Sequence, residues 1–185
     1  RGRLTLIIET MQPSLCPADA ASGKLRREAR LAPELHKAGT RHLAVSPQGQ
    51  IAVAMQYVGA PEDAVPLLAL DDGDGLVPLL PPEAVRRRQR QYAGAVAYDA
   101  GGRYVAVSHP RGGLITLWDG AEKRFLGSHR IADGCGLAPT ARPGTFLVTA
   151  GSGELRLLDA ASGEAEAFDL PDLAARAWDN HIARG

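Results

Sequence analysis

Short apolar stretches alternate with turn-forming residues along most of the chain, and this alternation predicts an all-β protein. The stretches are four to eight residues long, rich in Val, Ile, Leu and Tyr, and bounded by Gly, Asp or Pro. These lengths and boundaries are typical of strands joined by tight turns. The predicted strands fall into three groups of four, at 42–45, 50–57, 65–70 and 76–80, at 94–98, 103–108, 114–118 and 124–130, and at 134–138, 145–150, 154–158 and 164–168.

One turn recurs along the chain at intervals of 40 to 52 residues. The string D-A-A-S-G occurs at 19–23 and again at 159–163, and similar turns lie at 71–75 and 118–123. The Asp of each turn is residue 19, 71, 119 or 159, so the intervals are 52, 48 and 40 residues. A repeat of this length with a turn at a fixed phase indicates the blades of a beta-propeller.

We therefore expect one partial propeller domain over residues 1–185, with four-stranded antiparallel blades. About four blades are present, as a hairpin at 4–31, blades at about 41–80, 94–130 and 134–170, and a closing strand at 177–182. Most propellers close with more blades, so the arc is either part of a larger propeller or completed by another chain. The sequence begins without Met or a leader peptide, and we expect further blades to precede it.

Composition narrows the class of protein. Apolar residues make up 45% and charged residues 23%, and the formal net charge is zero. A nucleic-acid-binding protein normally has a basic surplus, so nucleic acid is not an expected partner. No apolar run approaches the roughly 20 residues that span a membrane. The two cysteines fall in distant blades, so we expect free thiols rather than a disulfide.

The densest basic cluster lies in the predicted connection between the first two full blades. It consists of Arg86, Arg87, Arg88 and Arg90, in a stretch that favours one or two turns of helix. Two interpretations remain open. The arginines are either solvated side chains of a connection or part of a site for an anionic ligand or partner.

Candidate ligand-binding residues gather where propellers usually bind ligands, at the axial end of the inner strands. Imidazoles and carboxylates that converge there could hold a transition metal, with His36, His42 and His181 as candidates. The alternative is that these residues tie one blade to the next. The axial candidates are Glu34, His36, Arg41, His42, Cys135, Asp179, Asn180 and His181, and a loop on a different edge adds His109 and Arg111.

Two of these stretches have a structural interpretation beside the functional one. In W-D-N-H at 178–181, the Trp can anchor the closing strand while the polar residues satisfy turn amides. The loop H-P-R-G-G at 109–113 is either a plain turn or an anion site made of guanidinium and glycine amides. The sequence contains no nucleophile elbow, phosphate loop or metalloprotease helix, so an enzyme is the less favoured class.

Several segments resemble an uncharacterised bacterial family, number 1513 among the domains of unknown function. They are E-T-M-Q-P-S-L (9–15), P-E-L-H (33–36), R-H-L-A-V (41–45), A-V-A-M-Q-Y (52–57), D-A-V-P-L-L-A-L (63–70), H-P-R-G-G (109–113), A-D-G-C-G-L-A-P (132–139) and W-D-N-H (178–181). The resemblance covers nearly the whole chain, which corresponds to the C-terminal half of such a protein. It implies a seven-bladed propeller similar to WD40 and YVTN-type propellers. It also implies export to the periplasm, often by a twin-arginine signal, and periplasmic iron-uptake proteins as partners.

Two functional hypotheses follow. The first is a non-catalytic binding or scaffolding propeller of the periplasm, linked to iron acquisition. The alternative is a propeller enzyme with a metal or cofactor on the central axis, similar to lactonases or quinoprotein dehydrogenases. The sequence identifies neither a cofactor nor catalytic residues.

Overall fold

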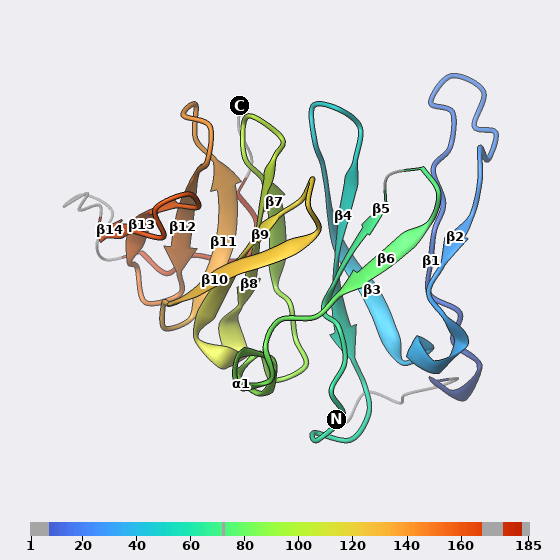
Figure 1. The fold of residues 1–185 in the computed structure, drawn as a ribbon, viewed down its shortest axis with the longest axis horizontal. Helices are drawn as coiled ribbons and strands as arrows, with labels where there is room; N and C mark the ends of the chain where they lie inside the picture. The colour runs from blue at the N-terminus through green and yellow to red at the C-terminus, as the bar shows by residue number, and fades with distance from the viewer. Residues whose placement is uncertain (1–7, 72, 168–175, 183–185) are drawn as a thin grey trace.

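Three four-stranded antiparallel sheets and one two-stranded sheet stand side by side in chain order (Figure 1). The structure is a computed structural model, and it describes residues 8–71, 73–167 and 176–182. Each larger sheet is a meander in which consecutive strands pair, as propeller blades require. The prediction of an all-β arc of four-stranded blades is therefore confirmed.

The blades follow the predicted strands closely. Blade one consists of β3 (Ala38–Val45), β4 (Ile51–Tyr57), β5 (Leu68–Asp71) and β6 (Leu76–Leu79). Blade two consists of β7 (Ala95–Tyr98), β8 (Tyr104–His109), β9 (Leu114–Asp119) and β10 (Arg124–Arg130). Blade three consists of β11 (Gly134–Pro139), β12 (Thr145–Ala150), β13 (Leu155–Asp159) and β14 (Ala165–Ala167). The predicted hairpin forms β1 (Ser14–Leu15) and β2 (Ala29–Arg30).

The remaining elements are short. A six-residue helix, α1 (Glu83–Arg88), connects blade one to blade two, where the sequence predicted helical turns. Three 3-10 turns complete the set within the described ranges: η1 (Ile8–Thr10), η2 (Pro33–Leu35) and η3 (Pro110–Gly112).

The core lies between blades, because successive residues of a strand point to opposite faces. In β9, Trp118 belongs to the cluster shared with blade one, whereas Ile115 and Leu117 belong to the cluster shared with blade three. The middle strands are therefore buried on both faces, while β10 and β14 contain no buried residue. This gradient explains why the last predicted strands of blades two and three, 124–130 and 164–168, carry charged residues.

The repeated D-A-A-S-G string forms the same turn twice. The carboxylate of Asp19 accepts hydrogen bonds from the amides of Ala21 and Ser22, and that of Asp159 from Ala161 and Ser162. Each turn ends on a glycine with positive φ, 68° at Gly23 and 74° at Gly163. The duplication seen in the sequence is thus a duplication of turn geometry.

Two expectations about strand limits need correction. Strand β3 begins at Ala38 rather than near residue 42, because the segment before a bulge at Thr40–His42 continues the pairing with β4. The segment 176–182 forms no strand, although we expected the closing strand at 177–182. It packs against Gly136 of β11 through Asp179 and Ile182, and among the described residues it forms no ladder with that strand. The predicted limits 4–31 and 134–170 extend partly outside the described residues.

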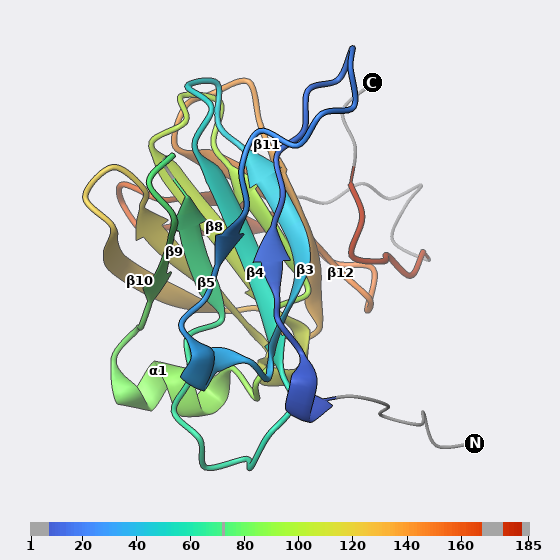
Figure 2. The ribbon, with the colours of Figure 1, turned by 90° about the vertical axis from the view of Figure 1, so that its right-hand side faces the viewer.

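The first strands of the blades form the inner edge of the arc. Strand β7 contacts both β3 and β11, and the exposed outer strands lie on the opposite side. Figure 2 shows the brick-red segment 176–182 on the side of these inner strands. This arrangement brings the end of the described chain to the first strand of blade one.

Candidate functional site

Two of the histidines that the sequence predicts as metal ligands lie beside each other on the inner edge of the arc. The ring centres of His42 and His181 lie 5.1 Å apart, with the ring planes inclined by 56°. His42 lies on β3, and His181 lies in the segment 176–182, which is 139 residues further along the chain. The fold therefore brings together blade one and the last described segment of the chain.

The environment of His42 favours a neutral imidazole. Partial burial lowers the pKa of His42, and the nearby His181 and Arg41 lower it further. His42 is half-buried, whereas His181 is exposed. A neutral ring with an accessible neighbour can accept a hydrogen bond or ligate a metal ion at neutral pH.

The segment that carries His181 is held against blade three. The thiol of Cys135 on β11 donates to the carbonyl oxygen of Trp178 at 3.3 Å, and the indole N–H of Trp178 donates to the carbonyl oxygen of Gly153 at 3.2 Å. Burial raises the pKa of the Cys135 thiol, so it is protonated and can donate. Cys135 and Trp178 thus position His181, and neither needs to touch a ligand.

Asp179 and Asn180 belong to the same segment. The side chain of Asp179 accepts a hydrogen bond from the backbone amide of Asn180 at 2.7 Å. This contact shapes the turn that precedes His181, in line with the structural interpretation of W-D-N-H.

Three other candidates lie before or on the first strand of blade one, and they do not join the histidine pair as ligands. Glu34 is exposed on η2, and His36 caps that turn, with Nδ1 3.0 Å from the carbonyl oxygen of Pro33. About 13 Å of extended strand separates Ala38 from His42, so His36 is far from the pair. The guanidinium of Arg41 binds Gln56.

His109 occupies the centre of a buried polar network in blade two. It has no exposed surface, and its Nδ1–H donates to the carbonyl oxygen of Tyr92 at 3.0 Å. Its Nε2 lies 3.1 Å from both Gln89 Nε2 and Thr116 Oγ1. Burial lowers the pKa of His109 to about 4. This residue is enclosed by protein and offers no face to a ligand.

Arg111 lies near His109 in sequence but has a separate role. Its guanidinium stacks over the ring of Tyr92, with 4.5 Å between guanidinium carbon and ring centre. The loop that carries it, η3, lies beside α1, since a methyl group on Gly112 would collide with the carbonyl oxygen of Arg88. The expectation that this loop lies on a different edge from the blade connections is therefore wrong. The two share an end because strand direction alternates within an antiparallel blade.

A cavity at this shared end involves the basic cluster. It measures about 420 Å³ and lies between α1 and the loop from β4 to β5. Arg86, Arg87 and Arg90 line it, whereas Arg88 does not. The sequence had indicated this cluster, but it gave no sign that residues 61–67 would form the opposite wall.

Metal-ligating residues form pairs rather than larger groups. Within residues 8–71, 73–167 and 176–182 no group of three or more His, Cys, Asp or Glu side chains could enclose a metal ion. A metal at His42 and His181 would therefore have two protein ligands from this part of the chain.

Residues 8–71, 73–167 and 176–182 contain no helix long and apolar enough to cross a bilayer.

The architecture defines a class: an all-β protein built of propeller-type blades with a histidine pair on its inner edge. Residues 1–185 match the family described as "Protein of unknown function (DUF1513)". Because the match covers the whole of this sequence, the chain belongs to that family, as its motifs indicated. No curated protein matches the chain.

Proposed function

We propose that this protein is a non-catalytic binding propeller that takes up a transition-metal ion at His42 and His181. The observation that carries this proposal is the 5.1 Å separation of the two rings. Two imidazoles on one tetrahedral ion have ring centres about 5 Å apart, because each metal–nitrogen bond is about 2 Å long. Imidazole is a suitable ligand for iron, copper, nickel and zinc.

The number of ligands supports binding rather than catalysis. Structural zinc sites use four protein ligands and catalytic ones three, which fix the ion firmly. A pair of imidazoles leaves more positions open to water or to groups of a partner. Such a site suits an ion that is held reversibly and passed on.

The family resemblance supports a proposal for the biological setting. We propose that the protein acts in the periplasm and takes part in iron acquisition. Its partners are then iron-uptake proteins. The metal ion held by His42 and His181 then serves as a point of contact with those partners, and the blades act as the scaffold.

Cobalt(II) titration tests the metal site, because the ion's visible absorption changes when imidazole replaces water. We expect saturable binding to the 185-residue chain, weakened at least about tenfold by His42→Ala and equally by His181→Ala. His129→Ala is the matched control, since His129 is also half-buried but lies on the outer strand β10. Equal affinities for all three variants would contradict the proposal.

A further inference from the structure

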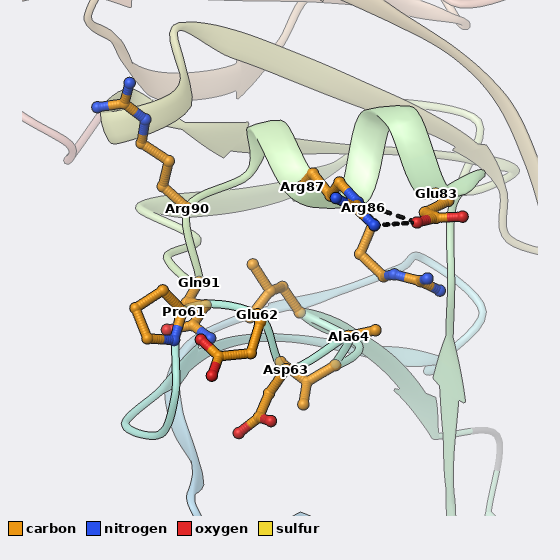
Figure 3. Close-up of a pocket in the computed structure, with 11 residues that line it drawn as sticks. Pro61, Glu62, Asp63, Ala64, Glu83, Arg86, Arg87, Arg90 and Gln91 are labelled. Carbon is orange, nitrogen blue, oxygen red and sulfur yellow. Dashed lines mark hydrogen bonds and ion pairs between the residues drawn. The ribbon is translucent and has the colours of Figure 1, made fainter.

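The cavity beside α1 is a second potential binding site, remote from the histidine pair. Its walls are α1 with the residues that follow it and the loop between β4 and β5 (Figure 3). Its volume of about 420 Å³ lies in the range of small-molecule sites. Val65 and Leu67, which belong to the buried core, supply an apolar floor.

Two of the three acidic side chains that line this cavity are paired within the protein, and the third, Glu62, is exposed at its rim. The carboxylate of Asp63 accepts hydrogen bonds from the hydroxyl of Tyr57 at 2.8 Å and from the amide of Ala60 at 3.1 Å. Glu83 is paired with Arg87, whose Nε lies 2.9 Å from the carboxylate. Neither carboxylate is therefore available to neutralise another arginine.

Arg86, in contrast to these carboxylates, has a side-chain donor that the described residues do not satisfy. It is half-buried, and its Nε atom is enclosed without a hydrogen-bond partner among the residues that the structure describes. Figure 3 shows its side chain extending from α1 toward the loop, whereas Arg87 turns to Glu83 and Arg90 leads away from the loop. An enclosed guanidinium donor without an acceptor is costly, and an anion in the cavity would supply the acceptor.

The segment that follows α1 and lines the cavity has a strained backbone. Arg90 and Gln91 both have positive φ, 49° and 54°, which costs side-chain-bearing residues about 1 kcal/mol or more each. Gln91 is fixed at both ends, since its carbonyl oxygen accepts from the amide of Tyr57 at 3.0 Å and its side chain donates to the carbonyl oxygen of Ala60. Consecutive strained residues at a cavity indicate a preformed site.

We propose that this cavity binds a small organic carboxylate. The carboxylate pairs with the guanidinium of Arg86, which can donate two parallel hydrogen bonds. The apolar body of the ligand packs on Val65 and Leu67. This site goes beyond the proposed metal site, shares no residue with it and does not depend on it.

Fluorine NMR with para-fluorobenzoate as the probe tests the assignment. We expect saturable binding to the 185-residue chain, and binding of the neutral analogue para-fluorobenzamide at least about tenfold weaker, because a charge-assisted hydrogen bond is lost. Inorganic phosphate is expected to compete at least about tenfold less well than the benzoate, since it has no apolar body. Equal competition by phosphate would overturn the assignment to an organic carboxylate.

Variants of α1 locate the site. Arg86→Gln is expected to weaken benzoate binding about tenfold to a hundredfold, whereas Arg88→Gln, on the same helix but outside the cavity, leaves it unchanged. Arg86→Lys keeps the charge and loses the bidentate geometry, so it gives an intermediate affinity and covers the case in which Arg86→Gln does not fold. Absence of saturable binding to the unaltered chain, or equal affinities for the Arg86 and Arg88 variants, overturns the proposal.

Discussion

Nε2 of His109 lies 3.1 Å from the hydroxyl oxygen of Thr116, and the indole N–H of Trp118 donates to that same oxygen at 3.0 Å. One hydroxyl thus joins a buried histidine to the largest fully buried side chain. Because these groups are enclosed within blade two, water cannot replace a lost partner.

Thr116→Val should destabilise the protein by about 1–3 kcal/mol, because the indole N–H of Trp118 would be left buried without an acceptor. Urea denaturation measures this loss. Thr145→Val is the matched control, since the hydroxyl of Thr145 is buried with no hydrogen-bond partner in the described part of the chain. Its substitution should change the free energy of unfolding by less than about 0.5 kcal/mol. Equal losses in the two variants would show that the network contributes nothing.

The buried His109 should make the protein less stable in mild acid. Its pKa is about 4 in the folded state against an ordinary value of 6.5, so the unfolded chain binds more protons between these values. The free energy of unfolding therefore falls as the pH drops through this window, by up to about 3 kcal/mol from His109.

His109→Gln removes this contribution, and the slope of unfolding free energy against pH should become shallower. His42 and His129 also have lowered pKa values, so part of the slope remains. His129→Gln, at a half-buried position, should alter the slope less. An unchanged pH profile in His109→Gln would mean that His109 is not buried in its neutral form.

Substitution of Asp99 should lower the free energy of unfolding more than substitution of any other turn residue between blades. Its buried carboxylate accepts three backbone amides, from Tyr104 at 2.7 Å, from Gly101 at 2.9 Å and from Gly144 of the next blade at 2.8 Å. Asp99→Ala should cost about 3 kcal/mol or more in thermal or urea unfolding, because three amides lose their acceptor. The more exposed turn at Asp159 is the comparison, and Asp159→Ala should cost about 1 kcal/mol. A smaller loss at Asp99 than at Asp159 would refute this ranking.

The position of the segment 176–182 can be tested at Gly136. A methyl group there would lie 2.9 Å from the carbonyl oxygen of Asp179 and 2.4 Å from the hydroxyl of Thr149, so Gly136→Ala must displace both the segment and the Thr149 side chain. We expect this variant to weaken cobalt binding several-fold, because His181 moves away from His42. Gly127→Ala is the control, since no atom lies within 4 Å of the added group. Unaltered cobalt affinity in Gly136→Ala would contradict the placement of His181.

The blades could be predicted from the sequence because their signals are local. Strand β10 has the predicted limits, and so does β12, since each lies between turn residues that are visible in the sequence. The Asp–Gly turns were equally clear, as Asp19 and Asp159 each bind the amides that follow them.

The site could be predicted only in part, because convergence in space is not a local property. His42 and His181 were both candidates, but nothing near either residue indicated that the other lies beside it. His36 was grouped with His42 because both were expected at the axial end of the inner strands, and the extended strand between them separates the two. The burial of His109 was missed because it depends on Gln89 and Thr116, which come from the connection and from a neighbouring strand.

X-ray absorption spectroscopy of the cobalt-loaded chain tests the central claim, a metal ion shared by His42 and His181. The account predicts scattering from two imidazole rings with cobalt–nitrogen distances of about 2.1 Å, the remaining positions being filled by oxygen. It predicts one ring in His181→Ala and two in His129→Ala. A spectrum of the unaltered chain without imidazole scattering would contradict the claim.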